Sequence, residues 1–213
     1  RTRAADSAAV VAFCNLVGGQ DELVFDGRSA IIDERGDVIA RGAQFQEDFI
    51  VADVDTAAVF RWRLHDPRLR KTATLGLPTV ELPPLPSDGA PLAACPELPT
   101  HVITPLLHLS EIYQALVLGT RDYIHKNGFK KVVIGLSGGI DSALVACIAA
   151  DALGAENVTG VSMPSRYTAD MSNDDAAALA ENLGIHYQVI PIEAVFRAYL
   201  DVLAEPFADV AAD

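Results

Sequence analysis

A dense cluster of prolines divides this chain. Eight of the twelve prolines in the 213 residues fall between Pro78 and Pro105. Proline fixes its own φ angle, lacks a backbone N–H and restricts the residue before it, so neither a helix nor a central strand continues through such a stretch. The cluster predicts a linker over residues 73–105, between folded parts at residues 1–72 and 106–213.

Composition restricts the class of protein. Half of the residues are hydrophobic and 21% are charged, which is typical of a globular chain. The three cysteines form no CxxC pair, which argues against a disulfide framework or a cysteine-rich zinc site. No apolar stretch approaches the ~20 residues of a membrane span, and the N-terminus lacks the layout of a signal peptide. We therefore expect a cytoplasmic protein with no membrane partner.

The charge balance excludes another class of partner. The chain carries 29 acidic and 16 basic side chains, a net charge of -13. Nonspecific affinity for a nucleic-acid backbone comes from lysine and arginine, which release counterions on binding. We therefore expect no nucleic-acid partner.

The part before the linker reads as short strands and one helix. The clearest prediction is a hairpin in which residues 29–32 pair with residues 38–40 across a polar turn. A helix is predicted from Asp55 to Leu64, with Asp55 or Thr56 as its N-cap. Further strands are predicted at residues 10–13, 23–25 and 49–54.

After the linker, helices and strands alternate. Strands are predicted at residues 132–136, 158–163 and 186–190, and helices at residues 109–124, 141–153, 172–183 and 192–203. Strands that read as buried on both sides and are joined by helices predict a doubly wound α/β unit, a parallel sheet with right-handed crossovers and both faces covered. Its ligand is expected at the carboxyl ends of the strands, near Leu136 and Met163.

A glycine-rich loop leaves the first of these strands and enters a helix. Two adjacent glycines allow a tight turn and close approach of a ligand, while free N–H groups of the first helical turn form an anion site. The loop is not the familiar GxxxxGK[ST] phosphate loop, because it has no lysine at that spacing. The candidate nucleotide-binding residues are Gly135, Leu136, Ser137, Gly138, Gly139, Ile140, Asp141 and Ser142.

Asp141 is an unexpected residue in an anion site. A carboxylate beside a phosphate is repulsive unless a cation lies between them, so Asp141 predicts a magnesium ion shared with phosphate oxygens. An alternative reading is that Ser137 and Asp141 only cap the helix and that the two glycines form a bare turn.

The same residues carry a resemblance. SGGIDS resembles the signature loop of the ATP-pyrophosphatases, which cleave ATP to AMP and pyrophosphate while adenylating an oxygen of their substrate. With MPSRYTADMSNDDA after the second strand, residues 112–192 resemble the synthetase domain of glutamine-dependent NAD synthetases. The resemblance implies a doubly wound, adenine nucleotide alpha hydrolase-like domain, present here in part, that uses ATP and Mg2+.

The segment after the second strand supplies two further candidates. Met163 is placed to hold adenine and Arg166 to approach ribose or phosphate oxygens. Ser172, with Asp175 three residues on, is a candidate N-terminal cap for the next helix. A strand end followed by an ordinary helix cap explains the same residues without a ligand.

The first part carries a second resemblance. NLVGGQDELVFDGRSAIIDERGDVIARGAQF resembles the closing part of a nitrilase-like amidase domain, an α-β-β-α sandwich that releases ammonia from glutamine. The family places its catalytic Glu, Lys and Cys upstream of this segment, so no catalytic residue is assigned. Cys14 reads as a buried, inert thiol. Gln20, Asp21 and Glu22 read either as part of the glutamine pocket or ammonia route, or as a solvated loop.

Together the two resemblances imply one reaction. ATP adenylates deamido-NAD, ammonia from glutamine displaces AMP to give NAD, and pyrophosphate is released, in a protein expected to be a homo-oligomer. Because the resemblance starts after the amidase catalytic groups and stops within the synthetase domain, we expect the isolated chain to be inactive. Two alternatives are a nucleotide-binding module without turnover and a structural segment between two domains.

Overall fold

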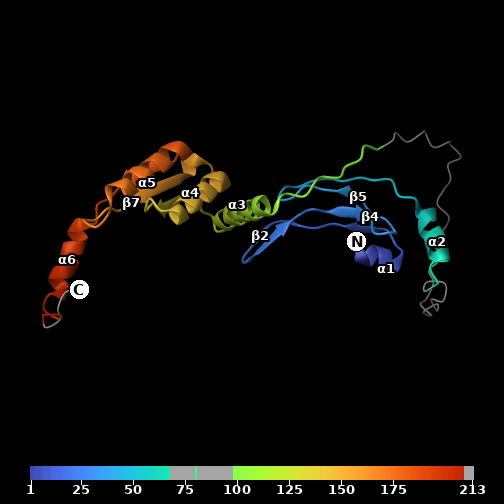
Figure 1. Cartoon of the computed structure of the whole chain (residues 1–213), viewed down its shortest axis with the longest axis horizontal. Helices are drawn as coiled ribbons and strands as arrows, with labels where there is room; N and C mark the ends of the chain where they lie inside the picture. The colour runs from blue at the N-terminus through green and yellow to red at the C-terminus, as the bar shows by residue number, and fades with distance from the viewer. Residues whose placement is uncertain (68–79, 81–97, 209–213) are drawn as a thin grey trace. The chain divides into compact units, whose positions relative to one another are not determined.

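The computed structural model describes residues 1–67, 80 and 98–208 and divides the chain into two compact units (Figure 1). The first unit comprises Arg1–Val17 and Asp26–Leu106, and the second comprises Gly18–Phe25 and Leu107–Asp213. Most of the predicted linker lies outside the described residues. None of the helices in the described ranges is both long and apolar enough to cross a membrane.

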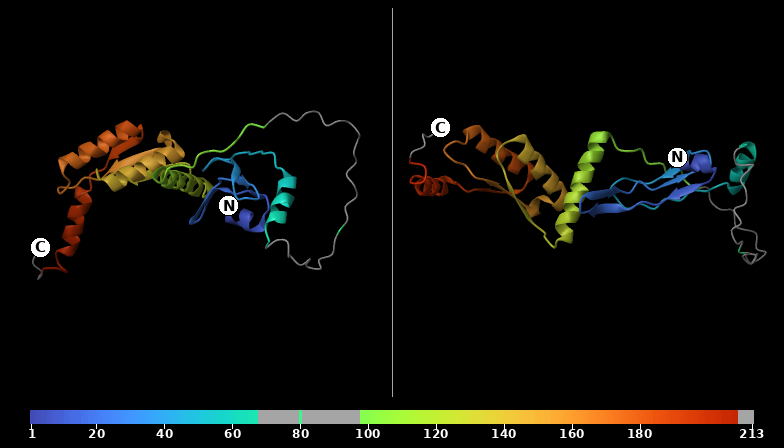
Figure 2. Two further views of the ribbon diagram at one scale, coloured as in Figure 1. Left: turned by 45° about the vertical axis from the view of Figure 1, so that its right-hand side comes forward. Right: turned by 90° about the horizontal axis from the view of Figure 1, so that it is seen from below.

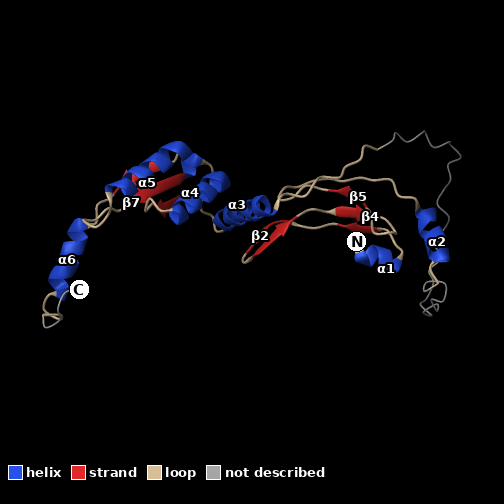
Figure 3. Ribbon diagram, viewed as in Figure 1, coloured by secondary structure: helices blue, strands red, loops and turns tan. Residues whose placement is uncertain are grey.

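The first unit is built on a small antiparallel sheet in the order β1 (Val11–Phe13), β4 (Ala30–Ile32) and β5 (Val38–Arg41) (Figure 3). Ala30 pairs with Arg41 and Ile31 with Ala40, which confirms the predicted hairpin. Its turn is held by an Asp33 carboxylate oxygen, which accepts hydrogen bonds from two backbone N–H groups of the turn at 2.9 and 2.8 Å.

Two helices belong to this unit, α1 (Thr2–Ser7) and α2 (Thr56–His65). Asp55 accepts hydrogen bonds from the N–H groups of Ala57 and Ala58, which confirms it as the α2 N-cap. The predicted strand at residues 49–54 is wrong: these residues form no strand, and Phe49 is 85% exposed. An apolar run needs a neighbouring strand to complete its hydrogen bonds, and no described strand pairs with this one.

A second hairpin consists of β2 (Val17–Gln20) and β3 (Leu23–Asp26). The sequence predicts β3 but not β2, because Gly18 and Gly19 weaken a strand signal. The turn is at Asp21 and Glu22, where Asp21 adopts φ 51°. Residues 18–25 of this hairpin belong to the second unit.

The second unit contains a parallel sheet in the order β6-β7-β8. Figure 2 shows its helices and strands, in yellow and orange, from two further sides. Val132 pairs with Val158 and Thr159 with His186, which confirms the predicted parallel pairing. The elements in chain order are α3 (His108–Lys126), β6 (Val132–Gly135), α4 (Ile140–Leu153), the short 3-10 helix η1 (Ala155–Asn157), β7 (Val158–Ser162), α5 (Asp170–Leu183), β8 (His186–Val189) and α6 (Glu193–Leu203).

Helices α4 and α5 pack against this sheet, and alanines let them approach it closely. The core consists of Leu136, Ala146, Ala149, Val158, Ala176, Ala180 and Ile185. Val133 remains 73% exposed and Val189 54% exposed, so the strands are not buried on both sides in the described part of the chain. In the strand order β6-β7-β8, both connections step in the same direction along the sheet. Right-handed connections that step in one direction place their helices, here α4 and α5, on the same face. The doubly wound sheet and the amidase sandwich stay predictions.

Helix α5 starts two residues earlier than expected. Its first residue is Asp170 and its N-cap is Ala169, with no side-chain capping bond. The predicted cap at Ser172 is therefore wrong, and Ser172 lies in the first turn of the helix.

Candidate functional site

A cavity of about 290 Å³ opens at the carboxyl ends of β6 and β7, where the sequence predicts the ligand. The predicted residues among its lining are Gly135, Leu136, Ser137 and Met163. The sequence did not single out the other three, Ser162, Thr168 and Asn173. Their position along the chain could have identified them, because these hydroxyl and amide side chains end β7 or follow it.

Two serines hold the shape of the glycine-rich loop. The Ser142 hydroxyl donates to the Gly139 carbonyl oxygen at 3.0 Å, and the Ser137 N–H donates to Ser142 Oγ at 3.3 Å. The Gly139 N–H donates to Ser137 Oγ at 3.3 Å. Both hydroxyls therefore brace the loop from within.

Helix α4 begins without a side-chain cap. Its N-cap is Gly139, and no side chain accepts a hydrogen bond from the first turn. Intrahelical bonding starts with the N–H of Ala143, which donates to the Gly139 carbonyl oxygen, so the N–H groups of residues 140–142 have no intrahelical acceptor. These donors and the positive end of the helix dipole suit an anion. The alternative in which Ser137 and Asp141 cap this helix is not supported, because the capping bond is absent.

Gly138 is required by packing inside the protein. It adopts φ 75°, and a Cβ there would lie 2.3 Å from the Ser172 carbonyl oxygen and 2.7 Å from Ser172 Cα. The loop therefore lies directly against the first turn of α5. Gly139 is less restricted, since its Cβ would meet only Ser137 Oγ at 3.3 Å.

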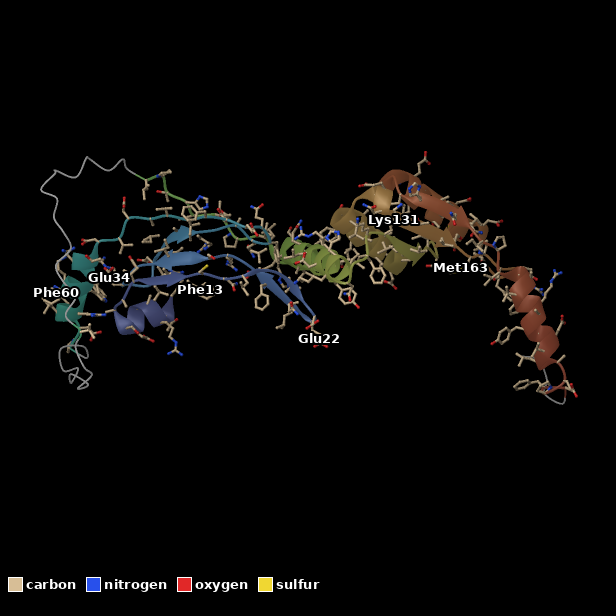
Figure 4. The ribbon with its side chains drawn as sticks, turned by 180° about the vertical axis from the view of Figure 1, so that it is seen from behind. Phe13, Glu22, Glu34, Phe60, Lys131 and Met163 are labelled. Carbon is tan, nitrogen blue, oxygen red and sulfur yellow. The ribbon has the colours of Figure 1, made fainter. Side chains whose placement is uncertain are left out.

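Leu136 and Met163 occupy different environments. Leu136 is 3% exposed, and its side chain fills the space over Gly160, where a Cβ would lie 2.4 Å from Leu136 Cδ1. It fixes the loop from the core and presents only backbone to a ligand. Met163, labelled in Figure 4, is 52% exposed, and its Cε would lie 3.5 Å from a Cβ at Gly135.

Asp141 and Ile140 lie in the exposed first turn of α4. Gly138, Gly139 and Ile140 border a second hollow of about 380 Å³, which α5 lines on its other side. Asp141 lines neither hollow. Residues 1–67, 80 and 98–208 contain no cluster of three or more metal-ligating side chains.

Arg166 is not brought to the loop. Its Nε donates to the two Glu193 carboxylate oxygens at 3.0 and 3.2 Å, and its guanidinium lies 5.4 Å from the centre of the Phe196 ring. Tyr167 meets the same ring edge-on at 5.9 Å. The hydrogen bond from Arg166 lowers the pKa of Glu193 from its ordinary value of 4.5 to about 2. The structure therefore joins Arg166 to the start of α6.

Cys14 is not the buried thiol that the sequence predicts. It follows β1, an outer strand of the three-stranded sheet, and is exposed. It borders a hollow of about 370 Å³ in the first unit, together with residues 15–17, 27–29 and 46–48. The apolar run before it is only partly covered, since Phe13 is 52% exposed.

Two family models match the chain. Residues 1–64 match the model described as carbon-nitrogen hydrolase, and residues 112–213 match the model described as NAD synthase. The class of protein is thus one that joins a carbon-nitrogen hydrolase segment to an NAD synthase segment. Together with the relatives below, these matches show that the chain belongs to the glutamine-dependent NAD(+) synthetase family.

Curated relatives match almost the whole chain. The glutamine-dependent NAD(+) synthetase of Thermotoga maritima is 48% identical over 97% of this chain, and that of Aquifex aeolicus is 45% identical over 100%. The chain spans only 35% and 37% of these two relatives. A solved structure, glutamine-dependent NAD+ synthetase from Acinetobacter baumannii in complex with ADP, has a TM-score of 0.73 and 33% identity, covering 100% of this chain and 34% of that one.

The contact between Gly138 and Ser172 predicts losses of stability of different size for two neighbouring substitutions. Gly138→Ala places a Cβ against α5 backbone at positive φ, and we expect a loss of about 2–5 kcal/mol in the free energy of unfolding. Gly139→Ala should cost less than about 1 kcal/mol. Urea unfolding followed by circular dichroism measures both, and equal losses would contradict the packing role of Gly138.

The Glu193 pair predicts a pH dependence. Because the folded pKa lies below the ordinary 4.5, the stabilisation is complete above pH 4.5 and is lost as the pH falls toward about 2. We expect the difference in urea midpoint between the unsubstituted protein and Glu193→Gln to shrink through this window. A difference that does not change between pH 6 and pH 2.5 would contradict the assignment.

Proposed function

We propose that the protein to which this chain belongs amidates deamido-NAD to NAD, using ATP and glutamine and releasing AMP and pyrophosphate. The observation that carries the proposal is the uncapped start of α4, which follows the carboxyl end of β6 inside the segment that matches the NAD synthase model. The names of the relatives support glutamine as the nitrogen source, and the ADP complex of the A. baumannii protein supports an adenine nucleotide.

In this proposal the loop binds the triphosphate through its backbone. The N–H groups of residues 140–142 donate to phosphate oxygens, and Ser137 and Ser142 keep the loop in shape. Fixed dipoles aimed at a leaving pyrophosphate stabilise the charge that develops on it. The cavity beside Met163 takes the adenine, whose apolar faces suit a thioether and the backbone of Gly135. Arg166, which pairs with Glu193 in the structure, stays the proposed contact to ribose or phosphate oxygens.

Asp141 suits a magnesium ion as a carboxylate ligand. Mg2+ usually keeps several waters and binds one or two carboxylates together with substrate phosphates, so one exposed carboxylate in the phosphate-binding turn matches its needs. When bound, Mg2+ neutralises phosphate charge and polarises the phosphoryl oxygens. The part of Asp141 is to hold the ion beside the first turn of α4.

The proposed reaction has two steps. Deamido-NAD presents its carboxylate to the α-phosphorus of ATP, an acyl adenylate forms and pyrophosphate leaves, and ammonia then displaces AMP. Positioning and charge stabilisation supply the rate enhancement. Residues 1–64 belong in this proposal to the amidase that releases the ammonia. We also propose that the protein acts in the cytoplasm as a homo-oligomer.

Product analysis of the complete enzyme tests this proposal. With ATP, Mg2+, deamido-NAD and glutamine, we expect NAD, AMP, pyrophosphate and glutamate in equal amounts. ADP and inorganic phosphate in place of AMP and pyrophosphate would contradict it, and so would nucleotide binding with no turnover.

Asp141→Asn tests the magnesium assignment. Asparagine keeps the size of the side chain but removes its charge, so ATP binding should weaken much more with Mg2+ than without it. At ~4 Å, two like charges repel by roughly 1 kcal/mol in water, so without Mg2+ the substitution should even relieve repulsion. Calorimetric titration in both conditions measures this, and an equal effect in both would remove Asp141 from the metal site.

A further inference from the structure

The β2–β3 hairpin is bound to α3 through the backbone of one residue. The Gly19 N–H donates to Asp122 Oδ2 at 2.8 Å, and Lys126 Nζ donates to the Gly19 carbonyl oxygen. Both side chains project from α3, one turn apart, so a carboxylate and an ammonium engage the two polar groups of a single glycine. We call this pair, Asp122 and Lys126, the Gly19 clamp.

Three glycines make this contact close. A Cβ on Gly19 would lie 3.1 Å from Gly119 Cα and 3.4 Å from Asp122 Cβ. A Cβ on Gly18 would lie 3.1 Å from Asp122 Oδ2, and one on Gly119 would lie 3.2 Å from Val24 Cγ2. Gly18 and Gly19 of the strand and Gly119 of the helix thus have no side chain at the contact, and the strand backbone lies close to the helix.

The Asp122 carboxylate of the clamp is partly buried and charged. The Asp122 side chain is 18% exposed and also accepts from Arg121 Nε at 3.2 Å. Burial by itself raises the pKa of Asp122, whereas the Gly19 N–H and Arg121 lower it, and the net shift is downward. A partly buried carboxylate that stays charged loses much when its donor is removed, so the contact resists separation.

The clamp joins segments that match different family models. The hairpin lies within residues 1–64, which match the carbon-nitrogen hydrolase, yet residues 18–25 belong to the same compact unit as α3, which lies in the NAD synthase match from residue 112 onward. At the hairpin tip, Gln20, Asp21 and Glu22 are exposed, and Figure 4 labels Glu22 there. Two strands of the segment that matches the carbon-nitrogen hydrolase thus contact α3 of the segment that matches the NAD synthase. Hydrogen bonds to the Gly19 backbone hold them there.

We propose that Asp122 and Lys126 are positioning residues that lock the β2–β3 hairpin onto α3 and thereby couple glutamine hydrolysis to NAD formation. The inference rests on the proposed function. If the Gly19 clamp is lost, the amidase and the synthetase each keep their own activity, but the ammonia released from glutamine is no longer used efficiently for NAD formation.

The test uses two substitutions in the complete enzyme. Asp122→Ala removes the acceptor of the Gly19 N–H, and Gly19→Ala opposes the approach to Gly119 without changing any charge. The matched control is Asp151→Ala, because Asp151 on α4 accepts a 2.7 Å hydrogen bond from the Tyr113 hydroxyl of α3. The control therefore removes a comparable tether of the same helix that does not reach the hairpin.

For both hairpin variants we expect glutamine-dependent NAD formation to fall about tenfold while ammonia-dependent formation stays within about twofold. The ratio of glutamate to NAD should rise above one, and hydrogen exchange at residues 18–25 should accelerate. Asp151→Ala should change none of these measures selectively.

Equal loss with both nitrogen sources, or no loss with either, would overturn the coupling role. Failure of the proposed function is distinguishable, because the unsubstituted enzyme would then form no NAD from either source, and the coupling proposal would fall with it.

Discussion

The contact between Gly138 and the first turn of α5 is the constraint on which the candidate site depends. It turns the chain sharply after β6, at a φ angle that favours glycine, and leaves no room for a side chain against Ser172. Helix α4 then starts at Ile140, directly after its N-cap Gly139, with its first N–H groups uncapped by a side chain. Donors that the protein itself leaves unsatisfied are the basis of an anion site.

Close approach of a partner to glycine backbone also occurs at the β2–β3 hairpin. At α4 the backbone is exposed for a ligand, and at Gly19 it is engaged by two charged side chains of α3. In both places glycine removes the side chain that would keep the partner at a distance. Backbone recognition thus serves the candidate nucleotide site and the attachment of the hairpin, and both lie in the second unit.

Local patterns predicted the fold well where the signal lay within a few residues. The Asp33–Asp37 turn, the Asp55 cap and the alternation around β6, α4 and β7 were all confirmed, because turns, caps and periodicity act over short distances. A missing tertiary partner caused the error at residues 49–54, which read as a strand but have no described strand to pair with. Local patterns also could not predict two long-range contacts of candidate site residues: Arg166 pairs with Glu193, and Gly138 packs against Ser172.

In the proposed site, the uncapped first turn of α4 binds the triphosphate of ATP. The change in backbone amide NMR shifts when ATP is added measures this binding residue by residue. We expect large shifts at residues 138–142 and none in the first turn of α3, which also lacks a side-chain cap and so serves as an internal control. Similar shifts at both helix starts, or shifts confined to other residues, would contradict it.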